Sequence, residues 1–115
     1  MATAAEIRNK AARELGVLAT GQTLRSEIST DLDAAYVEVY ALLEAEKVAS
    51  WAIADAVPSR DVASVVALVA EARVNVYSVP NDRYQRIVAA APGAFKQLKR
   101  YNAQPKTEDT PIENF

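Results

Sequence analysis

The segment from Val62 to Ala70, VASVVALVA, constrains the fold more than any other part of the chain, because Ser64 is its only polar residue. A segment of this kind cannot offer a polar face to water, so other elements must cover it. A buried strand is the rival interpretation, but the stretch to Tyr77 is long for a strand, is rich in alanine and contains no turn signal. We therefore predict a helix at the centre of the molecule, started by Pro58-Ser59.

An amphipathic helix is predicted from Thr3 to Leu15, where apolar residues recur at helical spacing. Thr3 and Glu6 have the S/T-x-x-E spacing of a capping box, which satisfies free amides at the start of a helix. Gly16 follows in the position where many helices end on a left-handed residue.

The stretch from Gly16 to Thr23, GVLATGQT, differs from the phosphate-loop pattern G-x-x-x-x-G-K-[ST] only in having Gln22 in place of the lysine. A phosphate loop must follow a strand and open a helix, so that its amides face the phosphates. Because Gly16 is expected to close a helix, we interpret the two glycines as a helix end followed by a turn at Gly21.

A long helix is predicted to begin between Ser26 and Thr30 and to end near Trp51 or Ala54. Glu46 falls in the middle of the apolar stripe of this helix. Either the helix bends before this residue, or the carboxylate is buried and must be paired.

Arg73 interrupts the apolar stripe of the central segment in much the same way. We predict that Glu46 and Arg73 form a structural ion pair, or at least that their charged groups lie within about 8 Å, the Debye length at physiological salt.

Val79-Pro80-Asn81 is expected to end the central helix and to cap another, which Pro92-Gly93 should break or restart. The whole pattern predicts an all-α fold, a bundle of four to five helices with a long second helix and an extended C-terminal tail. Residues 1–103 form the helical domain in this interpretation, and residues 104–115 form an extended C-terminal arm.

Charge is divided along the chain. Six carboxylates lie between Glu27 and Glu46 with Lys47 as the only base of the predicted long helix, whereas six bases against Asp82 alone lie between Asn81 and Lys106. The long helix is therefore acidic, and the C-terminal part is basic.

The chain has no cysteine and no histidine. Disulfides, thiolate nucleophiles, histidine-based acid-base catalysis and nearly all zinc chemistry are thereby excluded. We expect neither an enzyme nor a cofactor or metal site. No apolar run approaches the ~20 residues that span a bilayer, and the N-terminal region lacks a signal pattern, so a cytosolic location without membrane contact is expected.

A family resemblance enters through the succession of motifs over residues 4 to 102. The motifs are, in sequence, ARELGVLATGQTL, Asp33-Ala34, Trp51, VPSRDVASVVALVA and QLKRYN. Their order resembles that in the head-to-tail adaptor proteins of tailed phages, in particular the tail accessory factors of short-tailed phages. The family's usual Leu-Asn within the long helix is Val39-Tyr40 here.

The resemblance implies a non-enzymatic virion protein at the head-tail junction. Such a protein forms a homo-oligomeric ring, generally of twelve copies, that docks on the portal protein and offers a platform to tail proteins. DNA would pass through the channel without sequence-specific binding, and an acidic channel wall would not grip its phosphates. The alternative is a small cytosolic helical interaction module or dimeric regulator.

Two groups of residues are candidates for a partner interface. In the C-terminal arm, Pro111, Ile112 and Phe115 end a polar segment, so they are interpreted as an anchor for the portal or a neighbouring subunit, with a frayed terminus as the alternative. The second group is Lys96, Lys99 and Arg100. A solvated helix face, contact with a neighbour's acidic helix and nucleic-acid binding all remain open for it.

Overall fold

In the computed structural model, residues 1–18 and 21–102 of the 115-residue chain are described. They form four α-helices, α1 (Ala4–Leu15), α2 (Ser26–Ala45), α3 (Val62–Ala72) and α4 (Asn81–Asn102), with a short 3-10 turn, η1 (Ser59–Asp61), before α3. Within these ranges there is no strand, and a single isolated bridge joins Ala2 to Val57. The predicted all-α fold is confirmed, while the predicted extended arm, 104–115, lies outside the described residues.

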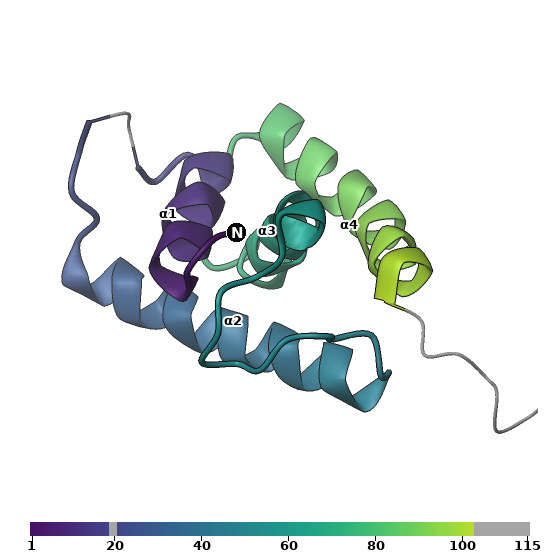
Figure 1. The fold of residues 1–115 in the computed structure, drawn as a ribbon. Coiled ribbons are helices and arrows are strands. Elements are labelled where there is room, and N and C mark those ends of the chain that lie inside the picture. Colours follow the sequence, from purple (N-terminus) through teal and green to yellow (C-terminus); the bar gives the residue numbers. More distant parts are fainter. Residues whose placement is uncertain (19–20, 103–115) are drawn as a thin grey trace, which may run out of the picture.

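The apolar segment is the central helix α3. It contacts α1, α2 and α4, whereas α2 and α4 make no direct backbone contact with each other (Figure 1). Val65 and Val69 are fully buried, and even Ser64 is nearly so. Because three helices surround it, α3 needs no polar stripe of its own.

Both predicted ends of α1 are confirmed. The Thr3 hydroxyl accepts from the Glu6 amide and the Glu6 carboxylate accepts from the Thr3 amide, which completes the capping box. At the other end Gly16 has a φ of 82°, in the left-handed region. The Arg83 side chain donates to the carbonyl oxygens of Arg13 and Glu14, so a cation from α4 stabilises the C-terminal end of the α1 dipole.

The prediction that α2 extends to Trp51 or Ala54 is wrong, because the helix ends at Ala45. Lys47 turns into the left-handed region with a φ of 61°. The Val48 amide then donates to the Leu43 carbonyl and the Lys47 amide to that of Glu44, the two bonds of a Schellman motif. Val48 and Leu43 are both buried, so an apolar contact in place of a glycine signal accompanies this helix end.

Lys47 is therefore expected to be strained. A Lys47→Gly substitution should raise the free energy of unfolding by about 1 kcal/mol, since glycine adopts a left-handed conformation without the steric cost of a Cβ atom. The matched control is Glu46→Gly at the preceding residue, whose φ of −85° suits any residue. This control should lower stability, and urea denaturation of the two variants measures both effects. Equal effects of the same sign would contradict the interpretation.

The segment after α2 returns along that helix and is fixed by Trp51. The indole nitrogen donates to the Tyr36 hydroxyl at 3.0 Å, and the Tyr40 hydroxyl donates to the Trp51 carbonyl at 2.6 Å. The rings of Tyr40 and Trp51 meet edge to face, 6.2 Å between centroids. These aromatic residues thus belong to the core, with hydroxyls bonded to protein groups.

The prediction that Pro92-Gly93 breaks the last helix is also wrong, since α4 continues through both residues. Proline removes one helical hydrogen bond. Pro92 lies on the exposed side of α4, whereas Ile87, Ala91 and Leu98 are buried on the other side. Burial of this apolar face against α3 compensates for one lost bond.

Candidate partner-binding surfaces

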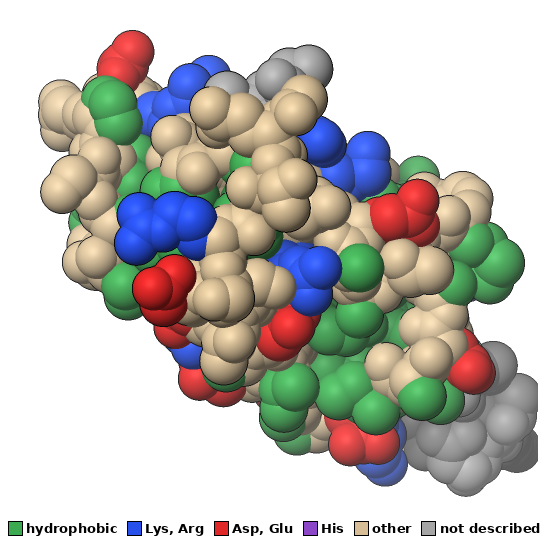
Figure 2. Space-filling model, turned by 90° about the vertical axis from the view of Figure 1, so that its left-hand side faces the viewer, with side chains coloured by type: hydrophobic (Ala, Val, Ile, Leu, Met, Phe, Trp, Pro, Cys, Tyr) green, Lys and Arg blue, Asp and Glu red, His purple; other side chains and the backbone are tan. Residues whose placement is uncertain are grey.

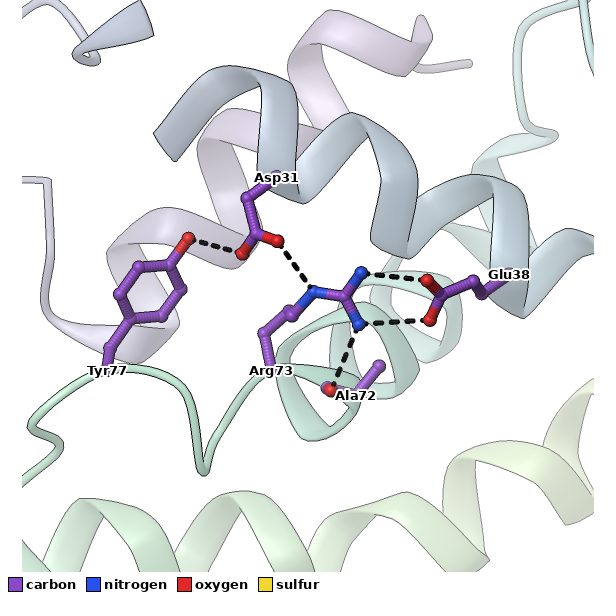
Figure 3. A network of polar contacts seen from close by, with 5 residues as sticks. All are labelled: Asp31, Glu38, Ala72, Arg73 and Tyr77. Carbon is purple, nitrogen blue, oxygen red and sulfur yellow. Dashed lines mark hydrogen bonds and ion pairs between the residues drawn. The ribbon is translucent and has the colours of Figure 1, made fainter. Parts of the chain in front are cut away.

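A polar network ties α2 to the segment that follows α3 (Figure 3). The Arg73 guanidinium donates through Nε to Asp31, at 3.0 Å, and through both Nη atoms to the two carboxylate oxygens of Glu38, at 3.0 and 2.9 Å. The Tyr77 hydroxyl donates to the second oxygen of Asp31 at 2.6 Å. The Arg73 side chain is only 13% exposed, so this network is a structural fastening rather than an open site.

Arg73 is thus paired, but with Asp31 and Glu38 and not with the predicted Glu46. Glu46 is exposed at the end of α2 and makes no ion pair within the described parts of the chain. The expected Glu46–Arg73 ion pair is not formed, because Arg73 meets Asp31 and Glu38, which lie about 22 Å and about 12 Å before Glu46 along the axis of α2. Asp31 and Glu38 lie two turns apart on one face of α2, and together they meet the guanidinium.

The network alters two pKa values. Hydrogen bonds from Arg73 lower the pKa of Glu38 below its ordinary value. Burial raises the pKa of Tyr77, and the hydrogen bond to the Asp31 carboxylate raises it further. Glu38 is therefore a carboxylate and Tyr77 a neutral donor at neutral pH.

Most carboxylates of α2 are neutralised within the chain. Besides Asp31 and Glu38, Asp33 pairs with Arg8 at 3.1 Å, and Glu27 lies 3.7 Å from Arg25. Glu44 and Glu46 make no ion pair among residues 1–18 and 21–102. Since Asp31 and Glu38 share the single charge of Arg73, one negative charge remains at that network, and the two unpaired carboxylates lie at the C-terminal end of α2. On the face of the molecule that includes α1, charges of both signs are interspersed (Figure 2).

The predicted basic interface residues of α4, unlike most carboxylates of α2, have no ion-pair partner in the described residues. Lys96, Lys99 and Arg100 are all exposed, and no carboxylate pairs with them in the described ranges. Lys99 lies 5.1 Å from the centre of the Phe95 ring, which is a cation–π contact within the same helix. These three charges remain available to another molecule. The other predicted interface residues, Pro111, Ile112 and Phe115, lie outside the described residues.

A groove of about 720 Å³ lies between α1 and α4, with α3 as its floor. Alanine and valine side chains of α3, with Ile87 and Ala90 of α4, make the lining largely apolar. Lys10 and Arg13 of α1 and Arg86 of α4 stand on the rim, together with one acid, Glu14. We call this the α1–α4 groove.

A second groove, of about 470 Å³, lies on the other side of α3, between α2 and α4. Its apolar lining includes the exposed side chains of Leu42 and Val88, and its charged residues are Glu46 and Glu71. We call this the α2–α4 groove. The two grooves differ in the sign of their charge.

A buried carboxylate fixes the end of α4. Asp61 is fully buried beside the start of α3, and its Oδ1 accepts from the Asn102 side chain at 3.0 Å. Arg60 donates to the Asn102 oxygen at 3.2 Å. The last described residue is thereby held against η1, so the chain leaves the described fold close to Ser59 and Val62.

Sequence reasoning missed both grooves. Lys10, Arg13 and Arg86 looked like ordinary solvated charges, because nothing in a single sequence indicates that α1 and α4 lie on either side of α3. The spacing of Ala63, Ala67 and Ala70 on one face of the central helix was the available signal.

No group of metal-binding side chains occurs in the described part of the chain. None of the helices there has the length and apolar character needed to cross a membrane. Comparison with protein-family models, with curated proteins and with solved structures finds no match for this chain.

Proposed function

We propose that this chain is a structural adaptor of a tailed-phage virion, which forms a ring on the portal protein and joins it to the tail. The observation that carries the proposal is the exposed basic cluster Lys96, Lys99 and Arg100, which is left without a carboxylate partner in the described chain. The succession of adaptor-like motifs over residues 4 to 102 supports it.

The contact between subunits in this proposal is head to tail. The basic end of α4 of one copy meets the acidic end of α2 of the next, where Glu44 and Glu46 are exposed. A contact between two different patches repeats from copy to copy and closes into a ring when the rotation permits it. DNA would pass through the middle of the ring. It would not be bound tightly if few Lys and Arg side chains lined the channel, because these are the groups that bind phosphates.

The oligomeric state tests this proposal. Light scattering of the purified chain, with and without its portal protein, should give a monomer or a ring alone and a ring-sized complex with the portal. A dimer that ignores the portal would instead support the helical interaction module or dimeric regulator. The apolar α2–α4 groove, with Leu42 51% and Val88 39% exposed, is the observation that favours this alternative.

Reversing the basic cluster should weaken assembly. We expect the triple variant Lys96→Glu, Lys99→Glu, Arg100→Glu to lower the affinity for the assembled ring or portal by on the order of tenfold or more. Wild-type assembly should weaken steeply with salt in the absence of DNA, because exposed charges are screened. Analytical ultracentrifugation measures both effects.

The control for this variant is Arg25→Glu, a charge reversal at an exposed position that precedes α2. It should leave assembly unchanged. If the triple variant also assembles like the wild type, the basic cluster is not the subunit contact.

A further inference from the structure

The α1–α4 groove has the features of a binding site for an acidic, partly apolar peptide. Three cations, Lys10, Arg13 and Arg86, stand on its rim against the single acid Glu14. The Arg86 guanidinium lies 3.5 Å from the Glu14 carboxylate, which leaves Lys10 and Arg13 without an ion pair in the described residues. The small side chains of its floor let a backbone lie close to α3.

We infer that this groove is the docking site of the chain's own C-terminal segment, Thr107–Phe115. The inference concerns the isolated chain and does not depend on the proposed virion function. It rests on the complementarity of the groove and the segment, and on the place where the described fold ends.

The complementarity concerns charge and apolar character together. Thr107–Phe115, TEDTPIENF, carries three carboxylates and no base, whereas the rim carries an excess of two positive charges. Its two large apolar residues, Ile112 and Phe115, match the apolar floor. The prolines at 105 and 111 favour extended backbone in the residues that precede them, which is the form a peptide takes in a narrow groove.

The chain that follows Asn102 is long enough to bring the docking segment into the groove. Asn102 is held against Asp61, one residue from the start of α3, and Ser59 and Val62 line the near end of the groove. The four residues from Ala103 to Lys106, which precede the docking segment, can span roughly 13 Å, and the floor from Val62 to Ala70 is about 12 Å long. A short tether of this kind gives the segment an effective concentration of about the millimolar range, so a weak contact is enough for docking within one chain.

The α2–α4 groove is a poor site for the same segment. It is lined by Glu46 and Glu71 and by no base, so it repels a peptide with three carboxylates. Each groove therefore serves as the control for the other. Docking would leave the segment unavailable to other molecules until a competing acidic peptide, or assembly, displaces it.

Spin labelling tests the inference directly. The chain has no cysteine, so Asn114→Cys provides one labelling site in the full-length protein. We expect the amide NMR signals of Ala63, Ala67 and Ala90, in the α1–α4 groove, to lose most of their intensity when the label is paramagnetic. The signals of Leu42 and Glu46, in the other groove and away from α3, should keep theirs. The effect should not depend on protein concentration.

Two variants of the labelled chain make the test specific. Arg13→Glu should lower the ratio of docked to free segment about fivefold, since it removes one cation from the rim and adds an anion. Arg25→Glu makes the same change in charge at an exposed position before α2, outside the groove, and should leave the intensity losses as they were.

Three results would overturn the inference. Uniform intensities along α3 and α4 would show that the segment does not dock. Losses confined to the α2–α4 groove would show that charge does not select the site. Losses that appear only when labelled and isotope-enriched chains are mixed would assign the groove to a second copy, whereas a failure of portal binding would bear on the proposed function alone.

Discussion

Replacing Trp51 with alanine is expected to lower the free energy of unfolding by about 3–5 kcal/mol, the range for truncating a buried aromatic side chain. Trp51 is 7% exposed, meets Tyr40 edge to face and donates to the Tyr36 hydroxyl. Its removal leaves a cavity against α2 and a buried hydroxyl without its donor. Denaturation followed by circular dichroism measures the loss, because the alanine variant has no tryptophan fluorescence.

Two further variants separate the causes. Trp51→Phe keeps an aromatic ring but loses the N–H donor. It should lower the free energy of unfolding by about 1–2 kcal/mol, the cost of leaving a buried hydroxyl without its donor. Ile53→Ala truncates a 41% exposed side chain in the same segment and should have little effect. If Trp51→Ala were as mild as Ile53→Ala, the segment after α2 would not be fixed as the structure has it.

Replacing Arg73 with alanine is expected to lower the free energy of unfolding by about 2 kcal/mol. Breaking a fully buried ion pair costs 3–5 kcal/mol, and the smaller value reflects the solvent exposure of the carboxylates. Asp31 loses its partner while still accepting from Tyr77. Arg73→Lys keeps the charge but cannot bond Glu38 and Asp31 in the same forked geometry, so it should recover only part of the loss.

The pH dependence of this effect follows from Glu38. Its pKa is lowered in the folded state from an ordinary value of 4.5, because Arg73 donates to the carboxylate. Stability from a lowered carboxylate pKa is present above the unfolded value and is lost as the pH falls through the folded value. The difference between the wild type and Arg73→Ala should therefore be largest near neutral pH and shrink below about pH 4.5. A difference that grew in acid would contradict this role of Glu38.

Arg73 marks a limit of what one sequence predicts. Arg73 and Glu46 both interrupted apolar stripes, so each was expected to need a partner. The need was real for Arg73, whose guanidinium is largely buried. Its partners depended on where the segment after α3 crosses α2, and that crossing places Arg73 beside Asp31 and Glu38, far from the end of the helix.

The sequence by itself determined the helices that have local signals. The capping box at Thr3 and the left-handed Gly16 each follow from interactions within a few residues, which the order of the amino acids specifies directly. The nearly apolar run from Val62 to Ala70 marked the helix that has to be buried. The tertiary structure alone decided that Trp51 lies beyond the end of α2 and packs back against it, that α4 continues through Pro92, and that two grooves form beside α3. These features arise between residues far apart in the chain, where burial of apolar area outweighs a local preference.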